Sequence, residues 1–129
     1  MKNNKVVLYA DDDADDRLLL ADAFEKVIED HSLELLSDGV AVMDFLRDKT
    51  PPMPCLLILD LNMPGLSGTE VMEKLKGDER YNNLPIVAFT TSSSEADRAA
   101  CSAYGVEMIT KPGDLREFEA TAVKLLSFC

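Results

Sequence analysis

The stretch LLILDLNMPGLSG, residues 56–68, decides the fold class of this chain. Its first four residues are all apolar, which is typical of a strand buried on both faces of a parallel sheet. The apolar run stops at Asp60, and Met63-Pro64-Gly65-Leu66 then has Pro and Gly where a type II turn prefers them. A buried strand that ends in a carboxylate and a tight turn indicates a polar site at one edge of a sheet.

The rest of the chain alternates short apolar runs with longer segments of helical spacing. Strands are predicted at residues 5–10, 33–36, 55–60, 86–90 and 106–110, each as a continuous run buried on both faces. Between and after them, helices are predicted around Leu20, Phe24, Val27 and Ile28; Val42, Phe45 and Leu46; Val71, Met72 and Leu75; Ala96, Ala99, Ala100 and Ala103 within 94–103; and Leu115, Phe118, Ala122 and Leu125. Asp114 and Glu117 are expected to form a capping box for the last helix.

This alternation of strands and helices predicts an α/β fold, a doubly wound, five-stranded parallel sheet with helices on both faces in an α/β/α arrangement of three layers. In such sheets the binding crevice lies beyond the carboxyl ends of the strands. The residues that end the strands are therefore the candidates for function.

Length and charge limit what the chain is expected to be. Its 129 residues leave room for one domain, predicted to span 1–129. The net charge of −11 argues against direct contact with nucleic acid, which needs a basic surface, and could favour a cation. Because no apolar run is long enough for a membrane span or a signal-peptide core, we expect a cytoplasmic protein without membrane insertion.

The cysteines and the histidine give no recognisable site by their spacing. Cys55, Cys101 and Cys129 form no C-x-x-C pair and no even set, so we expect separate thiols and neither a disulfide framework nor a zinc site. His31 is the only histidine, which argues against a histidine-based metal cluster or a catalytic triad. It is predicted to lie in a loop or at the start of a strand.

Polar side chains follow four of the predicted strands. Asp11 and Asp12 come after the first strand, Asp60 ends the third, Thr90 ends the fourth, and Lys111 follows the fifth. Carboxylates gathered at one edge would repel each other unless a cation balanced them, and Mg²⁺ prefers such oxygen ligands. Asp60 could then attack phosphorus as a nucleophile, with Lys111 as a positive partner for phosphate oxygens.

Four motifs together resemble the receiver domains of bacterial response regulators, the chemotaxis-regulator-like family, and occur in that family's order. They are VLYADDDADD at 7–16, LLILDLNMPGLSG at 56–68, IVAFTTSS at 86–93 and MITKP at 108–112. The resemblance implies a flavodoxin-like sheet with strand order 2-1-3-4-5. It further implies site roles for six residues: Asp11 and Asp12 as Mg²⁺ ligands, Asp60 as phosphoacceptor and metal ligand, Asn62 as a metal ligand through its backbone carbonyl, and Thr90 and Lys111 as partners of the phosphoryl oxygens.

The same resemblance implies a stand-alone regulator of a two-component system or phosphorelay. A phosphohistidine on a sensor kinase or phosphotransfer protein would donate the phosphoryl group. The domain would be a switch rather than an enzyme in the usual sense, because it catalyses only its own phosphorylation and dephosphorylation. Its output would be a changed contact with a downstream protein, unidentified from the sequence, and a phosphorylation-dependent homodimer stays open.

Three positions depart from the family pattern. Met108 stands where an aromatic residue is common, Thr91 where Ala or Gly is common, and Gly113 where a larger residue is frequent. The aromatic residue couples the switch hydroxyl to the output face in well-studied members, so we expect this surface to repack differently around a flexible Met. Thr91 is expected to crowd the water that hydrolyses the acyl phosphate.

Three alternatives are weighed against this interpretation. A flavodoxin-like electron carrier would share the fold, but the acidic cluster after the first strand would repel an FMN phosphate and the chain has no Trp to stack on a flavin. An aspartyl-phosphate phosphohydrolase usually has a second acid two residues after its nucleophile, where this chain has Asn62. A receiver that docks without being phosphorylated is disfavoured by the presence of Asp60, Thr90 and Lys111.

Overall fold

The computed structural model describes residues 5–27, 30–48, 53–91 and 94–129. Within these ranges five strands, β1 (Lys5–Ala10), β2 (His31–Leu36), β3 (Leu56–Leu59), β4 (Ile86–Thr90) and β5 (Glu107–Thr110), form one parallel sheet in the order β2-β1-β3-β4-β5. The helices are α1 (Ala14–Val27), α2 (Gly39–Arg47), α3 (Gly68–Lys76), α4 (Glu95–Ala103) and α5 (Glu117–Leu126), with a 3₁₀ turn at Glu79–Tyr81. The predicted fold class and strand order are confirmed.

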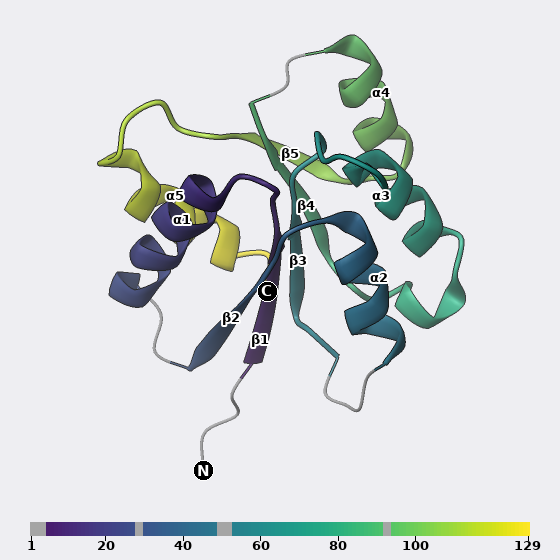
Figure 1. The fold of residues 1–129 in the computed structure, drawn as a ribbon, viewed down its shortest axis with the longest axis horizontal. Coiled ribbons are helices and arrows are strands. Elements are labelled where there is room, and N and C mark those ends of the chain that lie inside the picture. Colours follow the sequence, from purple (N-terminus) through teal and green to yellow (C-terminus); the bar gives the residue numbers. More distant parts are fainter. Residues whose placement is uncertain (1–4, 28–29, 49–52, 92–93) are drawn as a thin grey trace.

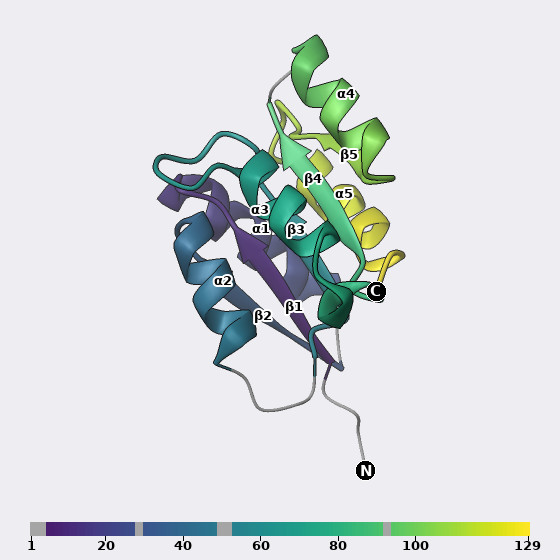
Figure 2. The same cartoon turned by 90° about the vertical axis from the view of Figure 1, so that its right-hand side faces the viewer.

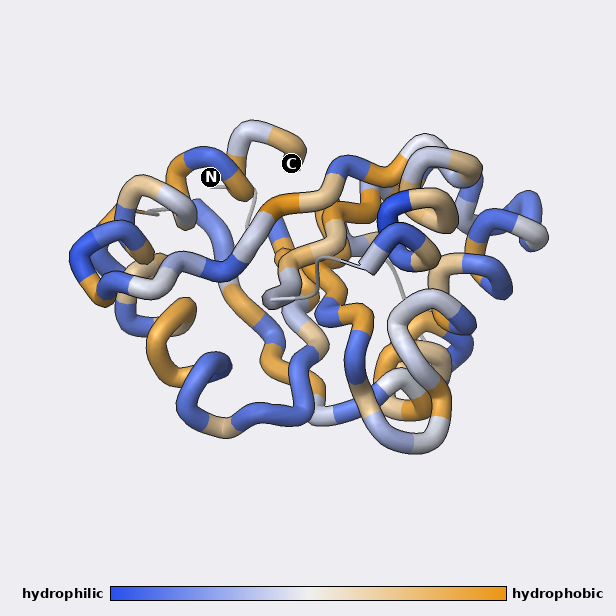
Figure 3. Tube along the Cα trace, turned by 90° about the horizontal axis from the view of Figure 1, so that it is seen from above, coloured by the Kyte–Doolittle hydropathy of each residue, from blue (hydrophilic) through white to orange (hydrophobic). Residues whose placement is uncertain are grey.

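The helices cover the sheet from both sides (Figure 1), with α1 and α5 on one face and α2, α3 and α4 on the other. Each face has its own apolar cluster, because successive strand residues point to opposite sides. Leu8, Leu57 and Ala88 pack towards α2 and α3, whereas Val7, Ile58 and Phe89 pack towards α1 and α5. Figure 2 turns the side covered by α2, α3 and α4 towards the viewer, with α1 behind the sheet, and Figure 3 shows hydrophobic stretches running through the interior.

The strands differ in how deeply they are buried. Every residue of β3 and β4 is buried, as the continuous apolar runs predict. In contrast, β2 begins at His31, two residues before its predicted start, and its exposure alternates along the strand. The predicted two-sided burial of this strand is wrong because β2 pairs only with β1 at the edge of the sheet, where Ser32 and Glu34 face solvent.

The start of α5 also differs from the prediction. This helix begins at Glu117 after Arg116, which makes no side-chain capping hydrogen bond. The expected capping box is absent because the Asp114 carboxylate accepts instead from the backbone N–H and guanidinium of Arg116. Leu115 consequently lies before the helix with 67% of its surface exposed, while the other three predicted stripe residues are buried.

In α4 the alanines do not form the buried side. Cys101 is the buried residue of this helix, and of the alanines only Ala100 packs partly against the core. Cys101 faces the core, and Tyr104, which caps the end of the helix, packs partly against the same cluster. The helix itself is confirmed, with Ser94 accepting a capping hydrogen bond from the Asp97 N–H at 3.1 Å. In the first helix, Leu20, Phe24 and Val27 pack as predicted, while Ile28 lies outside the described residues.

The expectation of three separate thiols is also wrong. Cys55 and Cys129 are joined by a disulfide, whereas Cys101 is free and buried. The pairing could not be read from spacing, because the two residues are 74 positions apart and only the fold brings β3 and the end of α5 together. Among the described helices, none combines the length and hydrophobicity that a membrane crossing requires.

Candidate functional site

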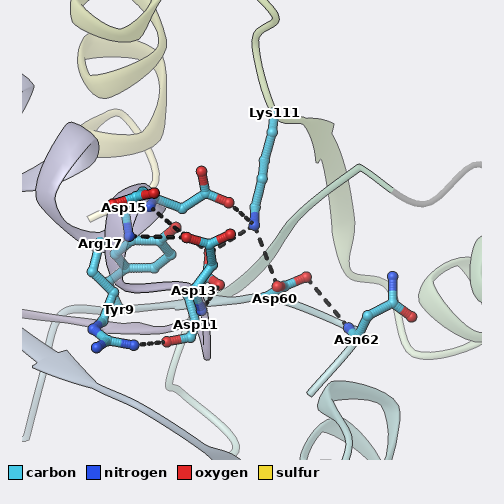
Figure 4. Close-up of polar contacts among 9 residues, drawn as sticks. Tyr9, Asp11, Asp13, Asp15, Arg17, Asp60, Asn62 and Lys111 are labelled. Atoms are coloured by element: carbon cyan, nitrogen blue, oxygen red, sulfur yellow. Dashed lines mark hydrogen bonds and ion pairs between the residues drawn. The ribbon is translucent and has the colours of Figure 1, made fainter. Parts of the chain in front are cut away.

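The polar residues predicted from the strand ends do meet at one edge of the sheet. Parallel strands all end on the same side, so Asp11 after β1, Asp60 after β3 and Lys111 after β5 converge there (Figure 4). The backbone fixes this arrangement: the Asp60 N–H donates to the Ala10 carbonyl at 3.0 Å, and the Asp11 N–H donates to the Leu36 carbonyl at 3.0 Å.

Lys111 is the centre of the site. Its Nζ lies 2.7 Å from Asp11 Oδ2, 2.8 Å from Asp16 Oδ2 and 3.3 Å from Asp60 Oδ2, and only 6% of its side chain is exposed. Burial alone lowers the pKa of Lys111, but hydrogen bonds to Asp11 and Asp16 and the charge of Asp60 outweigh it and hold the pKa above its ordinary value. The ammonium is therefore charged at neutral pH and is aimed at the carboxylates.

Asp60 is a buried carboxylate, with 5% of its surface exposed. Burial raises its pKa from 3.8 to about 6, against the lowering effect of Lys111 and with a further raising effect from the charge of Asp11. The Asn62 N–H donates to Asp60 Oδ1 at 3.3 Å, and the turn that follows has Gly65 at φ 72°, as the predicted type II turn requires. Asp60 thus has one oxygen held by backbone and the other turned to Lys111.

Asp11 is buried more deeply than Asp60, with none of its surface exposed. The Tyr9 hydroxyl donates to Asp11 Oδ2 at 2.5 Å, and the Asp13 N–H donates to Asp11 Oδ1 at 2.9 Å. Burial, and then the hydrogen bond to Asp11, raise the pKa of Tyr9 well above its ordinary range, so the phenol stays a donor. Arg17 Nη1 donates to the Asp11 carbonyl at 2.6 Å and holds the loop against α1.

Three carboxylates could hold a metal ion. One oxygen from each of Asp11, Asp12 and Asp60 lies within 4.8 Å of the other two, with Asp11 and Asp60 buried and Asp12 exposed to solvent. Hard oxygen donors with one open side suit a cation such as Mg²⁺, which keeps several waters. The residues present therefore fit a divalent cation.

The remaining predicted site residues lie around this group. Thr90 is fully buried at the end of β4, and its carbonyl accepts the Lys111 N–H at 2.9 Å. Thr91, next to it, is exposed. Met108 packs partly buried against the apolar cluster on the α2, α3 and α4 side of the sheet, as a flexible side chain in the usual aromatic position can. The structure brings Asn62 to the site through its N–H; its carbonyl ligand role stays a prediction.

Sequence reasoning missed two members of the site, Asp16 and Tyr9. Asp16 lies in the acidic run 11–16, from which only Asp11 and Asp12 were predicted as site residues. Asp13 caps the first helix, since its Oδ1 accepts from the N–H groups of Asp15 and Asp16. Asp16 itself sits in the first turn of α1 and reaches Lys111. The sequence did contain a signal for Tyr9: a phenol within a buried apolar strand needs a hydrogen-bond partner nearby.

Known proteins resemble this chain in both sequence and fold. The chain is 34% identical over 118 residues to response regulator Rcp1 of Synechocystis sp., covering 88% of this chain and 80% of the relative. The crystal structure of the Mn²⁺-bound form of Rcp1 matches with a TM-score of 0.86 at 32% identity, over 96% of this chain and 93% of that one. The crystal structure of the phosphorylated cyanobacterial phytochrome response regulator RcpA also matches with a TM-score of 0.86, at 27% identity, over 98% of this chain and 96% of that one.

The family assignment rests on the length of the match. The pattern of the response regulator receiver domain covers residues 7–123, which includes β2 to β5, most of β1 and the edge where Asp60 and Lys111 meet. This chain therefore belongs to the response regulator receiver domain family.

Proposed function

We propose that this protein is a phosphorylation switch in which Asp60 takes a phosphoryl group from a phosphohistidine on a sensor kinase or phosphotransfer protein. The observation that carries the proposal is the position of Lys111 Nζ, 3.3 Å from the Asp60 carboxylate and 2.7 Å from that of Asp11. A buried carboxylate beside a fixed ammonium and two further acids has a nucleophile, a positive charge for phosphate oxygens and ligands for a cation in one place.

The residues divide the work of phosphoryl transfer. An Asp60 oxygen attacks phosphorus, the P–N bond of the phosphohistidine breaks, and its electron pair returns to the imidazole, which takes up a proton. Lys111 balances charge on the phosphoryl oxygens, and we assign the Thr90 hydroxyl the same task. Tyr9, Asp13 and Asn62 hold the carboxylates in place through their hydrogen bonds to Asp11 and Asp60.

We infer that Asp11, Asp12, Asp60 and the Asn62 carbonyl hold Mg²⁺. When bound, this ion neutralises charge that develops on the transferring phosphoryl group. The Mn²⁺-bound form of the relative Rcp1 and the phosphorylated form of RcpA support binding of a cation and a phosphoryl group by this chain as well. A single receiver domain over 1–129 in the cytoplasm would pass its signal on by protein contact, at the surface of α4, β5 and α5, or by phosphoryl transfer within a relay.

Phosphorylation by a small donor tests the proposal. The protein is incubated with Mg²⁺ and acetyl phosphate, and intact mass is measured for one added phosphoryl group. We expect an adduct that requires Mg²⁺, is lost in Asp60→Asn and persists in Asp15→Asn, a matched change in an exposed acid of the same acidic stretch. If neither acetyl phosphate nor a phosphohistidine protein gives an adduct on Asp60, the chain is a docking module and the proposal is wrong.

A further inference from the structure

A second group of reactive side chains lies at the end of the sheet opposite Asp60, where the strands begin. His31 begins β2, Cys55 immediately precedes β3, and Cys129 follows α5. A ring nitrogen of His31 and the sulfur atoms of both cysteines lie within 4.8 Å of one another. No step of the proposed phosphoryl transfer uses any of these residues.

The fold, rather than local sequence, brings the three together. His31 pairs with Lys5 in the β1–β2 ladder, and the Cys55 N–H donates to the carbonyl of the next β1 residue, Val6, at 2.9 Å. Both therefore sit beside the start of β1. After α5 the chain ends in tight turns, with the Phe128 N–H donating to the Leu125 carbonyl and the Cys129 N–H donating to the Leu126 carbonyl. Cys129 lies there beside Cys55, with 4.9 Å between their Cα atoms.

The cysteines are placed for a bond with each other rather than for a metal. Their Cα atoms are 4.9 Å apart, inside the range of about 4.4–6.8 Å that disulfides occupy. Both side chains are half-buried against the apolar cluster of the α1 and α5 face. His31 also lines a pocket of about 330 Å³ with Ala21, Phe24, Glu25 and Leu33, so its ring borders both the sulfur atoms and open space.

We propose that Cys55, Cys129 and His31 form a thiol–disulfide site, in which peroxides oxidise the two thiols to the observed disulfide and dithiols reduce it again. In a reducing cytoplasm two such thiols are mostly reduced, so a pair held at bonding distance responds to an oxidant instead of serving as a permanent brace. The site is independent of the proposed phosphorylation, because it shares no residue with the Asp60 edge.

The oxidation balances as a two-electron reaction. The thiol proton of one cysteine passes to the His31 ring, and the thiolate attacks a peroxide oxygen, which gives a sulfenic acid and one water. The second sulfur then attacks the sulfenic sulfur, forming the S–S bond and releasing a second water. Two thiols and one hydrogen peroxide thus become one disulfide and two waters. Exchange with a dithiol reverses the bond through a mixed disulfide.

The bond changes how α5 is held. In the oxidised protein a covalent link closes a loop of 74 positions and ties the end of α5 to the start of β3. In the reduced protein α5 is held by Phe118, Ala122 and Leu125 in the core and by the exposed Lys26–Glu119 pair with α1. Since a cross-link of this length mainly restricts the unfolded chain, oxidation is expected to raise Tm strongly.

The test follows mass and melting temperature together. Protein reduced with dithiothreitol and freed of reductant is treated with hydrogen peroxide, then analysed by intact mass, peptide mapping and thermal melting. We expect the loss of two hydrogens, a Cys55–Cys129 peptide, and a Tm about 10 °C or more above that of the reduced protein, reversed by dithiothreitol. Cys101→Ala should keep these changes, whereas Cys129→Ser should lose them.

Two further measurements test the role of His31 and distinguish a thiol–disulfide site from a zinc site. His31→Gln should slow oxidation several-fold while reaching the same disulfide, and an unchanged rate would overturn the role given to His31. The reduced protein is also dialysed with Zn²⁺ and its metal content measured. Retention of one Zn²⁺ that protects the thiols would make the site a metal centre, and disulfides only between molecules would likewise overturn the proposal.

Discussion

Burial of the Asp60 carboxylate imposes an electrostatic cost on the folded protein. Burial raises its pKa to about 6, so the metal-free folded protein binds a proton at Asp60 that the unfolded chain, with a pKa near 3.8, releases more easily. The folded state therefore has this contribution in full below about pH 4 and loses it as pH rises through 6. The nucleophile role that we propose for Asp60 needs the ionised carboxylate, so this role lowers the stability of the metal-free protein near neutral pH.

We predict that Asp60→Asn stabilises the metal-free protein above pH 6. The gain should be of the order of 2 kcal/mol at pH 7.5 and should shrink towards zero near pH 4, because the neutral amide avoids the cost of ionisation while Lys111 keeps Asp11 and Asp16. Urea unfolding of the variant and the parent protein in EDTA across this pH range measures the difference in unfolding free energy. Asp12→Asn, at an exposed carboxylate of the same trio, should change stability far less; equal effects would contradict the burial argument.

Tyr9 offers a second prediction at this scale. Tyr9→Phe removes the hydroxyl that donates to the buried Asp11 carboxylate, so we expect a loss of about 1–3 kcal/mol in unfolding free energy and weaker Mg²⁺ binding. Tyr104→Phe is the matched control, because its hydroxyl makes an exposed contact with Glu73 at 3.4 Å. Denaturant melts and Mg²⁺ titrations of both variants measure the difference, and similar losses would mean that burial of the Tyr9 bond is unimportant.

At the scale of elements, the start of α3 positions Asp60, the proposed phosphoacceptor. The Gly68 N–H donates to the Leu61 carbonyl at 3.1 Å, and Ser67 with Glu70 forms a capping box that fixes where the helix begins. A Cβ on Gly68 would lie 2.2 Å from the Asp60 carbonyl oxygen and 2.6 Å from Leu61 Cα. The helix can approach the end of β3 this closely only with glycine at that position.

We therefore predict that Gly68→Ala displaces the backbone of Asp60. It should lower stability by about 2 kcal/mol or more and slow phosphorylation by acetyl phosphate at least tenfold, because the clash is with backbone that cannot turn away. Gly77→Ala, at the other end of α3, meets only ordinary contacts at 3.4 Å and 3.8 Å and serves as the control. Phosphorylation rates by intact mass decide, and a Gly68→Ala variant as fast as Gly77→Ala would contradict the prediction.

At the scale of the whole molecule, the net charge of −11 and the acidic edge act together. Excess negative charge favours any cation near the site, and salt screens that attraction. We predict that Mg²⁺ at about a hundred times its Kd stabilises the protein by about 2.7 kcal/mol, seen as a Tm rise of several degrees that EDTA abolishes. Raising the ionic strength from about 0.02 to 0.5 M should weaken Mg²⁺ binding several-fold.

A matched pair of variants separates the site from the overall charge. Asp12→Asn and Glu34→Gln each remove one exposed negative charge, but Glu34 lies on β2 outside the carboxylate trio. We expect Asp12→Asn to reduce the Mg²⁺-dependent Tm rise strongly and Glu34→Gln to leave it nearly unchanged. Equal reductions would mean that Mg²⁺ binds diffusely to the acidic surface.

The sequence by itself determined the architecture and most of the edge that carries function. Continuous apolar runs at β3 and β4 and polar residues directly after them are local features, and parallel strands necessarily bring their ends to one side. For that reason Asp11, Asp60 and Lys111 could be grouped before any contact was known, and the structure places both carboxylates within 3.3 Å of Lys111 Nζ.

Only the tertiary structure decided the contacts that depend on how separate elements meet. The bond between Cys55 and Cys129, the reach of Asp16 to Lys111 and the buried side of α4 all join segments that no local spacing connects. The edge exposure of β2 was likewise set by its position in the sheet. Periodicity records which face of an element is apolar, whereas long-range packing selects the partner that this face meets, and the partner is fixed only when the chain has folded.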